Sequence, residues 1–362
     1  MLALNALAGE TPTSLIQAGG WFLEKAWIIP ALPAISFVLI LFFGKRMKYK
    51  GAEFGIISIA VAFIFAICCV GQWIGQVNNA DSYTEKQEFH DGEKHSDKAD
   101  HHETLSDEIY RTSSTEEGPA PSEDMTVLAV AEGGDGSGSV GIKPVVERFT
   151  WWESGGRAFQ VGIMVDGLAV LMLFVVTAVS LLVHIYSTEY VAGDRRYTHY
   201  FAFLSLFSAS MLFFVLSENV LQAIVGWELV GVCSFALIGH WWEEKPNSDA
   251  ALKAFLTNRV GDMGLLIGMS ILFWSAGSWS IIDINNAAIN HDIGHSTLLI
   301  ASLCLTAAVM SKSGQFILHT WLPDAMAGPT PVSALIHAAT MVVAGIYMVA
   351  RLYGVFFEGF DI

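Results

Sequence analysis

The residues of this sequence that could do chemistry are ionisable side chains inside long apolar runs. Lys312 and His337 lie in two consecutive runs, and Glu228 lies in an earlier run that reads VGWELVGVC. A charge at membrane depth costs about 2.5–3.5 kcal/mol on insertion scales, so each needs a physical reason to be there. Burial disfavours the charged form of a lysine and a nearby carboxylate favours it. We therefore predict proton transfer, with Lys312 as the carrier and Glu228 as its partner.

Each of these assignments has a structural alternative. Lys312 could belong to a static ion pair that fixes helix packing, and Glu228 could pair with Arg259 instead. Arg259 and Asp262 lie three residues apart, on one face of a helix, where they could satisfy each other. His337 follows the helix of Lys312, which favours a proton relay over the commoner role of a core histidine.

The segment between the runs of Lys312 and His337 predicts a broken membrane helix. Proline removes a backbone donor and ends a helix, which lipid tolerates only where protein or a water-filled cavity satisfies the freed groups. Broken helices beside ionisable residues are typical of ion sites near the bilayer midplane. The residues that predict the break are Pro323, Gly328, Pro329 and Pro331. The polar residues that could form an entry path there, or cap helix ends, are His319, Asp324 and Thr330.

The apolar runs predict an all-α polytopic membrane protein of about eight transmembrane helices. Of the 362 residues, 53% are hydrophobic and 15% are charged, against about 25% charged residues in an ordinary soluble domain. Asp166 and His184, near the two ends of the third helix, are expected to be capping or solvated residues. A polar loop is expected at about 283–295, before the seventh helix, which breaks after residue 315 and continues in a short piece to about 326. The predicted helices cover about 27–44, 55–74, 161–186, 197–216, 220–241, 254–274, 296–315 and 331–353.

An acidic segment, about 78–152, interrupts the apolar pattern. Residues 81–150 hold 17 Asp or Glu against six Lys or Arg, which accounts for 11 of the 16 net negative charges. Low hydrophobicity with high net charge predicts a largely disordered insert. Its histidines lack a compact spacing, so no metal site is predicted on this chain. The predicted organisation is a lead-in with two helices at 1–77, the insert at 78–152, a helix and loop at 153–196, and a helical unit at 197–362.

Basic residues predict the orientation of the helices. They gather in the loops after the first, third and fifth predicted helices, at residues 45–50, 195–196 and 245–253. All three loops fall on one side, which is therefore expected to be cytoplasmic. The acidic insert would face the periplasm, and the break after the seventh helix would open from the cytoplasmic side.

Several other classes of protein lack their signatures here. The sequence has no basic patch for nucleic acid, no GxGxxG after a strand, no P-loop, no CxxC and no GxSxG. The four cysteines lie in apolar runs without metal-ligand spacing. We therefore expect no nucleotide, flavin or iron–sulfur cluster on this chain.

Three motifs resemble one family closely. GWELVGVCSFALIGHWW, KAFLTNRVGDMG and the run from SKSGQFILHTWLPDAMAGP to ALIHAATMVVAGIYMVAR are similar to subunit L, or chain 5, of the proton-pumping NADH:quinone oxidoreductase, complex I. The resemblance covers about 163–356. It implies an antiporter-like membrane subunit, in which a five-helix repeat spans the fourth to eighth predicted helices and the seventh is discontinuous. It also implies that Glu228, Lys312 and His337 form the relay and that Arg259 and Asp262 support it.

The resemblance carries expectations about partners. It implies no redox cofactor on this chain, with NADH, FMN, iron–sulfur clusters and quinone on partner subunits. The partners would be other membrane-arm subunits, the lipid bilayer and protons, and no nucleic acid. The bacterial plasma membrane is a better match than the mitochondrial inner membrane. The second repeat expected of this family does not follow Ile362, so the chain is as readily a fragment as a complete protein.

Three functions follow from these observations. The first is a proton-translocating subunit of a respiratory quinone reductase, a translocase without redox chemistry of its own. The second is the large subunit of a multisubunit Na⁺/H⁺ antiporter, which would share the same motifs. The third is a scaffold that holds other membrane subunits and conducts no protons.

Overall fold

The computed structural model describes residues 15–17, 19–96, 141–154, 157–338 and 340–361. The chain forms two compact units. The smaller contains residues 1–18 and 74–143, and the larger contains residues 19–73 and 144–362. The larger unit holds every predicted site residue.

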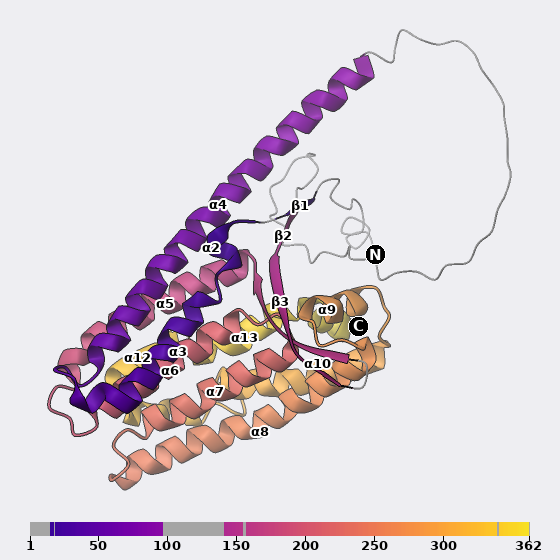
Figure 1. The fold of residues 1–362 in the computed structure, drawn as a ribbon. Coiled ribbons are helices and arrows are strands. Elements are labelled where there is room, and N and C mark those ends of the chain that lie inside the picture. The colour runs from indigo at the N-terminus through magenta and orange to yellow at the C-terminus, as the bar shows by residue number, and fades with distance from the viewer. Residues whose placement is uncertain (1–14, 18, 97–140, 155–156, 339, 362) are drawn as a thin grey trace, which may run out of the picture. The chain divides into compact units, whose positions relative to one another are not determined.

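The larger unit is a bundle of helices with one β-hairpin (Figure 1). Its first half contains α2 Trp21–Glu24, α3 Ile28–Phe43, the 3₁₀ turn η1 Gly44–Arg46, the start of α4 Ala52–Ser96, the strands β3 Val145–Ser154 and β4 Arg157–Val165, α5 Gly167–Tyr190 and α6 Tyr197–Val215. Its second half contains α7 Val220–Ile238, α8 Lys245–Ala276, α9 Ile281–Ile289, α10 His295–Lys312, α11 Trp321–Asp324, the 3₁₀ turn η2 Ala325–Ala327, α12 Thr330–Ala338, α13 Met341–Arg351 and α14 Tyr353–Phe360.

Seven helical segments within the described residues are long and apolar enough to cross a membrane. They are α3 with η1, the first part of α4, α5, α6, α7, α10, and α12 together with α13. The 32-residue helix α8, which corresponds to the sixth predicted helix, is not among the seven, and it carries both Arg259 and Asp262. The predicted all-helical membrane fold is therefore confirmed, with a hairpin added.

The hairpin corrects the predicted start of the third helix. Residues 161–165, expected to be helical, belong to β4, which pairs with β3 in antiparallel register from Val145–Val165 to Ser154–Arg157. The helix α5 begins only at Gly167, because Asp166 caps it and accepts a hydrogen bond from the backbone N–H of Ala169 at 2.7 Å. The capping role expected for Asp166 is therefore present.

The acidic insert contains more regular structure than predicted. The helix α4 does not end near residue 74 but continues to Ser96, through a segment rich in Glu, Lys and Gln that favours helix. In the smaller unit, β1 Leu15–Gln17 pairs in parallel with β2 Gly141–Lys143. The strand β3 also lies almost wholly inside the predicted insert. The part of the disorder prediction that concerns residues 97–140 lies outside the described residues.

Two further boundaries differ from the prediction. The expected loop at about 283–295 contains the helix α9, Ile281–Ile289. The eighth predicted helix is divided into α12, α13 and α14. The first division follows α12 directly after Ala338, and Thr340 has backbone angles φ −133° and ψ −91°, which no helix contains. The interruption between α12 and α13 thus lies within three residues of His337.

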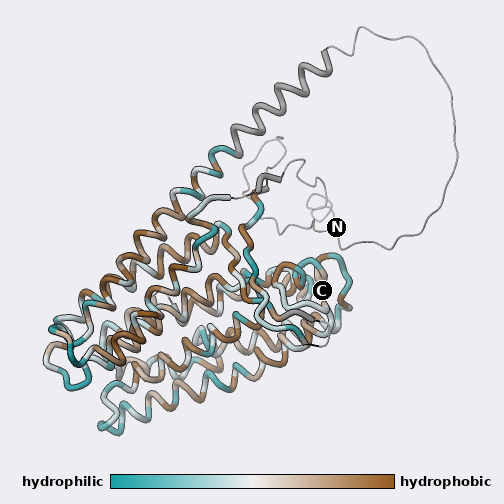
Figure 2. Tube along the Cα trace, in the orientation of Figure 1, coloured by the Kyte–Doolittle hydropathy of each residue, from teal (hydrophilic) through white to brown (hydrophobic). Residues whose placement is uncertain are grey.

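Helices pack side by side around a core in which α8 lies along α10, α3 lies against α6, and α6 lies against α7. Hydrophobic residues run along the helices, and hydrophilic residues gather in the turns between them (Figure 2). The turns α3–α4, α5–α6 and α7–α8 lie at the same end of the bundle (Figure 1). The three basic loops therefore share one side of the membrane domain, as their charges predict.

Candidate functional site

The side chain of Lys312 lies at the last position of α10 and is completely buried. Its ammonium nitrogen donates a hydrogen bond to the backbone carbonyl of Trp227 on α7, at 3.0 Å. It also lies 5.0 Å from the centre of the Trp227 ring, which is a cation–π distance. A lysine in such a dry position has few groups that stabilise its charge, so small changes around it alter its proton affinity.

The carboxylate partner predicted for Lys312 is bound elsewhere. Glu228 forms an ion pair with Arg259 of α8, which is the alternative weighed from the sequence. Arg259 also lies 3.3 Å from a carboxylate oxygen of Asp262, the predicted partner on its own helix. Arg259 therefore lies between two acids, and no described contact joins Glu228 directly to Lys312. The reason is geometric, because the guanidinium of Arg259 reaches Glu228 from the neighbouring helix.

Asp262 connects this ion cluster to the lysine through Trp227. The indole Nε1 of Trp227 donates a hydrogen bond to Asp262 at 2.5 Å, and the backbone carbonyl of the same residue accepts from Lys312. Asp262 is 2% exposed and Trp227 is 1% exposed, so this link is dry. By contrast, the side chain of Glu228 is 25% exposed and that of Arg259 is 31% exposed. The cluster thus runs from a buried end at Lys312 to a partly exposed end at Glu228.

Gly231 of α7 leaves room for two cationic side chains, which come from α8 and α10. A Cβ atom at this position would lie 2.9 Å from a guanidinium nitrogen of Arg259 and 3.1 Å from the ammonium of Lys312. The two cationic groups are therefore no more than about 6 Å apart, which follows from these two distances. Cations this close in a low-dielectric interior repel each other, so the charge of one affects the other.

The predicted break lies next to the lysine. After α10 ends at Lys312, Trp321 of α11 fills the gap, is completely buried, and donates its indole N–H to the carbonyl of Ser311 at 2.8 Å. The hydroxyl of Ser313 donates to the carbonyl of Val342 on α13 at 2.7 Å. Backbone groups freed by a broken membrane helix must be satisfied by protein or water, and these side chains satisfy two of them.

His337 lies on α12, the helix that follows the break. Its ring centre is 6.4 Å from that of Trp321, and within the described residues neither ring nitrogen has a hydrogen-bond partner. Buried polar atoms without a partner are uncommon, which is consistent with a position that water or a movable group visits. Beyond His337, the hydroxyl of Thr340 donates to the carbonyl of Leu335 at 2.6 Å and closes the end of α12.

The remaining predicted residues lie at the basic end of the bundle. Asp324 forms an ion pair with Lys253 of α8 at 2.5 Å, and the hydroxyl of Thr330 lies 3.1 Å from that of Tyr190. His319 is exposed and stacks on Phe316. Pro323 lies inside α11, Gly328 ends η2 and approaches the end of α7, Pro329 precedes α12, and Pro331 lies in its first turn. The break therefore faces the side of the basic loops.

Two ion pairs, each with one buried member, were not predicted from the sequence. Arg351 donates two hydrogen bonds to Asp166, at 2.6 and 3.0 Å, and one to Tyr347 at 2.7 Å. A signal was present, because an arginine inside an apolar run requires a partner. The capping or solvated role expected for His184 was wrong, because the residue lies inside α5 and not at its end. The residue is completely buried, and its Nδ1 lies 2.7 Å from the carbonyl of Ser180.

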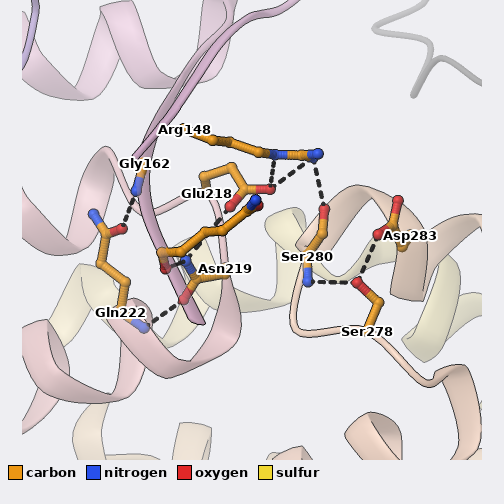
Figure 3. A network of polar contacts seen from close by, with 9 residues as sticks. Arg148, Gly162, Glu218, Asn219, Gln222, Ser278, Ser280 and Asp283 are labelled. Carbon is orange, nitrogen blue, oxygen red and sulfur yellow. Dashed lines mark hydrogen bonds and ion pairs between the residues drawn. The ribbon is translucent and has the colours of Figure 1, made fainter. Parts of the chain in front are cut away.

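The second missed pair holds the hairpin on the helices (Figure 3). Arg148 of β3 donates to Glu218 at 2.9 Å and to Ser280 at 3.2 Å, and Glu218 is 1% exposed. Nearby, the backbone N–H of Gly162 donates to Gln222 at 3.0 Å. No local pattern in the sequence connects β3 with the α6–α7 turn, because 70 residues separate Arg148 from Glu218.

Two known sequence families match the part of the chain that contains the ion cluster. Residues 217–361 match a sequence family described as the transmembrane region of NADH:quinone oxidoreductase and the Mrp antiporter. Residues 151–201 match the family described as the N-terminus of chain 5 of NADH–ubiquinone oxidoreductase, complex I. Together these two matched segments cover the hairpin strand β4, the Arg351–Asp166 pair, Glu218 and every predicted site residue.

Curated relatives match a similar part of the chain. The chain is 47% identical over 219 residues to the chloroplastic NAD(P)H-quinone oxidoreductase subunit 5 of Adiantum capillus-veneris, which covers 59% of this chain and 30% of the relative. It is 48% identical over 216 residues to NAD(P)H-quinone oxidoreductase chain 5 of Synechocystis sp., covering 58% of this chain and 31% of the relative. The chain thus spans about a third of the length of the curated relatives it matches.

A solved structure of an Mrp complex from Dietzia sp. shares the fold. The TM-score is 0.63 at 21% identity, and the match covers 93% of this chain and 28% of that chain. The likeness supports the helical architecture of the described residues. The two family matches and the relatives at 47–48% identity together show that this chain is similar to the chain 5 antiporter-like membrane subunits of complex I.

Proposed function

We propose that this chain is a proton-translocating membrane subunit of an NAD(P)H–quinone oxidoreductase. The observation that carries the proposal is the completely buried ammonium of Lys312, at the end of a broken helix and about 6 Å or less from a second cation. The matched families and the names of the relatives supply the type of complex. In this proposal the chain serves as part of a translocase, and the redox chemistry takes place elsewhere.

The charge of Lys312 is set by the position of Arg259. While Arg259 is bound to Glu228, its guanidinium remains close to Lys312 and opposes a second positive charge there. Protonation of Glu228 would release Arg259 toward Asp262, which already lies 3.3 Å away. Arg259 would then neutralise more of the charge of Asp262, and the attraction of Asp262 for the charged lysine would weaken. The two acids and the arginine thus form the element that changes the proton affinity of the lysine.

His337 receives or supplies the proton on the other side of the break. The ring of His337 lies next to Trp321, and Trp321 separates this ring from the end of α10. Within the described residues, neither ring nitrogen of His337 has a hydrogen-bond partner. A histidine can exchange protons near neutral pH, which suits a relay. Asp324 and Thr330, at the basic end, are the proposed entry side, and His319 extends it toward solvent.

The proposal includes partners that this chain does not contain. NADH or NADPH, FMN, iron–sulfur clusters and quinone would bind to other subunits, and this chain would contact the other membrane-arm subunits. A bacterial plasma membrane is the proposed location of this multi-pass protein. These points rest on the family and on the relatives, which are about three times longer than the matched segment.

The test is proton uptake by vesicles that contain the assembled complex. Lys312→Ala should abolish most of the uptake that NADH drives, while NADH oxidation shows that the complex is intact. Lys245→Ala is the matched control, because Lys245 is 84% exposed and forms an ion pair with Asp249 four residues along its helix. Uptake by Lys312→Ala equal to that of the control would refute the role of Lys312.

The Mrp likeness supports a second candidate, the large subunit of a multisubunit Na⁺/H⁺ antiporter. The two candidates differ in what drives proton movement. Vesicles that contain an NAD(P)H–quinone oxidoreductase acidify on addition of NADH. Vesicles that contain a Na⁺/H⁺ antiporter change their internal pH when a Na⁺ gradient is imposed. A Na⁺-driven pH change that Lys312→Ala removes, without any response to NADH, would select the antiporter.

A further inference from the structure

The three turns at the basic end of the bundle enclose a pocket that the proposed proton path does not use. The pocket has a volume of about 490 Å³. Its charged lining residues are Lys45, Lys50, Arg195, Arg196 and Glu243. Four cations against one carboxylate give this pocket a strong positive potential, which focuses anions.

Three of these cations are available to a ligand. Arg196 is already bound, because it donates to the carbonyl of His240, pairs with Glu243 and lies 4.0 Å from the ring of Trp242. Lys45, Lys50 and Arg195 are exposed, and in the part of the chain that the structure describes their side chains have no hydrogen bond or ion pair. Charged groups that converge without a partner are a ready site for an anion with several oxygens.

The turns that carry these cations are held in place by internal contacts. Asp194, in the α5–α6 turn, accepts hydrogen bonds from Trp241 at 2.9 Å and lies 3.3 Å from Nε2 of His240, both in the α7–α8 turn. In the α3–α4 turn, a Cβ atom at Gly44 would lie 2.7 Å from the methyl group of Thr198, so this turn lies tightly against α6. The pocket is therefore preorganised, which lowers the cost of binding.

We propose that this pocket binds the phosphate headgroup of an anionic phospholipid. The chain's membrane helices end at this level, and Trp242 is exposed beside the pocket, as tryptophans are at a membrane surface. Phe42 and Phe43, at the end of α3, are 71% and 50% exposed and lie only two or three positions before Lys45. A headgroup in the pocket could thus extend its acyl chains along α3. Basic pockets between membrane helices on the cytoplasmic side bind such headgroups elsewhere.

The experiment measures lipid retention by the purified full chain after delipidation. The protein is incubated with micelles that contain equal amounts of phosphatidylglycerol and phosphatidylcholine, and bound lipid is quantified by mass spectrometry. The variant Lys45→Gln, Lys50→Gln, Arg195→Gln should retain at least about tenfold less phosphatidylglycerol, because each basic residue near a membrane surface adds to anion affinity. The control Arg46→Gln, Lys48→Gln, Lys245→Gln removes the same charge from the same side outside the pocket and should retain wild-type amounts.

A second arm distinguishes a lipid from a soluble anion and requires no substitution. Wild-type protein should retain less phosphatidylglycerol in 0.5 M NaCl, because salt screens the attraction, whereas inorganic phosphate at millimolar concentration should displace little of the lipid. Equal retention of the two lipids by wild-type protein, or equal loss in the two triple variants, would overturn the proposal. So would full displacement by inorganic phosphate, which would assign the pocket to a free anion.

Discussion

Lys312 donates its hydrogen bond to the backbone carbonyl of Trp227, at 3.0 Å, and not to a carboxylate. The indole of the same tryptophan donates to Asp262 at 2.5 Å. Trp227 therefore holds the buried amine with its backbone and the buried acid with its side chain. Because one residue contacts both groups, substitutions that change only the side chain can separate the two interactions.

The first prediction concerns Trp227→Phe. This change keeps the carbonyl that binds Lys312 but removes the donor to Asp262, which is 2% exposed. An unsatisfied buried acceptor costs about 1–3 kcal/mol, so we expect a lower thermal unfolding temperature together with slower proton uptake. Trp242→Phe is the control, because Trp242 is 52% exposed. Unfolding temperatures that fall equally in both variants would contradict the role given to the Trp227 indole.

Gly231→Ala tests the crowding of the two cations. The added methyl would lie 2.9 Å from Arg259 and 3.1 Å from Lys312, so both flexible side chains must shift. We expect reduced NADH-driven proton uptake at unchanged NADH oxidation in vesicles that contain the complex. Gly71→Ala on α4 is the matched control, because its added Cβ would have no atom within 4 Å. The prediction fails if both variants take up protons at the wild-type rate.

The coupling of Glu228 to Arg259 can be measured by a double-mutant cycle. If Arg259 transmits the charge of Glu228 to Lys312, Glu228→Gln and Arg259→Gln should each slow proton uptake, and the double variant should be little slower than either single one. Proton uptake and NADH oxidation are measured for all four proteins. Additive effects would mean that the two residues act independently.

The hairpin should depend on one ion pair. Arg148→Gln leaves the carboxylate of Glu218, which is 1% exposed, without its charged partner, and we expect a loss of stability of about 1–3 kcal/mol. Because the Arg148 side chain is 39% exposed, water will compensate part of the loss. The double variant Arg148→Gln, Glu218→Gln should recover most of the wild-type unfolding temperature. If the double variant is less stable than Arg148→Gln, the Arg148–Glu218 ion pair is not what holds the hairpin on the helices.

The α5–α6 and α7–α8 turns should loosen in mild acid. Burial lowers the pKa of His240 and outweighs the nearby carboxylate of Asp194, which favours the charged imidazole. The folded state thus binds a proton less readily than the unfolded state, so the contribution of His240 to stability is present above pH 6.5 and is lost as the pH falls below it. The unfolding temperature should decrease between pH 7 and pH 5, and less so in His240→Gln. An identical decrease in both proteins would exclude His240.

Asp194 contributes in the same direction at lower pH. Burial alone would raise its pKa, but the backbone N–H of Arg196 and the side chains of Trp241 and His240 outweigh burial and lower it. Its carboxylate is therefore favoured by folding, and that stabilisation is lost only as the pH falls below the ordinary range of an aspartate. Asp194 therefore contributes little between pH 7 and pH 5, and the difference between wild type and His240→Gln measures the part of the decrease that His240 causes.

Much of this architecture was accessible from local sequence. The lengths of the apolar runs predicted where the membrane helices lie. The predicted bounds of α3, α6 and α7 differ from the structure by no more than three residues at either end. The interruption between α10 and α12 was also predictable, because prolines and glycine act on their own backbone. The hairpin was not, because β3 and β4 gain their stability from each other and from the α6–α7 turn.

The sequence by itself determined which ionisable residues enter the membrane, on which helices they lie and where the helix breaks, because those properties depend on residues close together in the chain. Only the tertiary structure decided that Glu228 pairs with Arg259, that Lys312 binds a backbone carbonyl of α7, and that Arg148 reaches Glu218. In a dry interior each charge takes the partner that helix packing brings within reach. Packing depends on which faces of distant helices meet, and no single stretch of the chain contains that information.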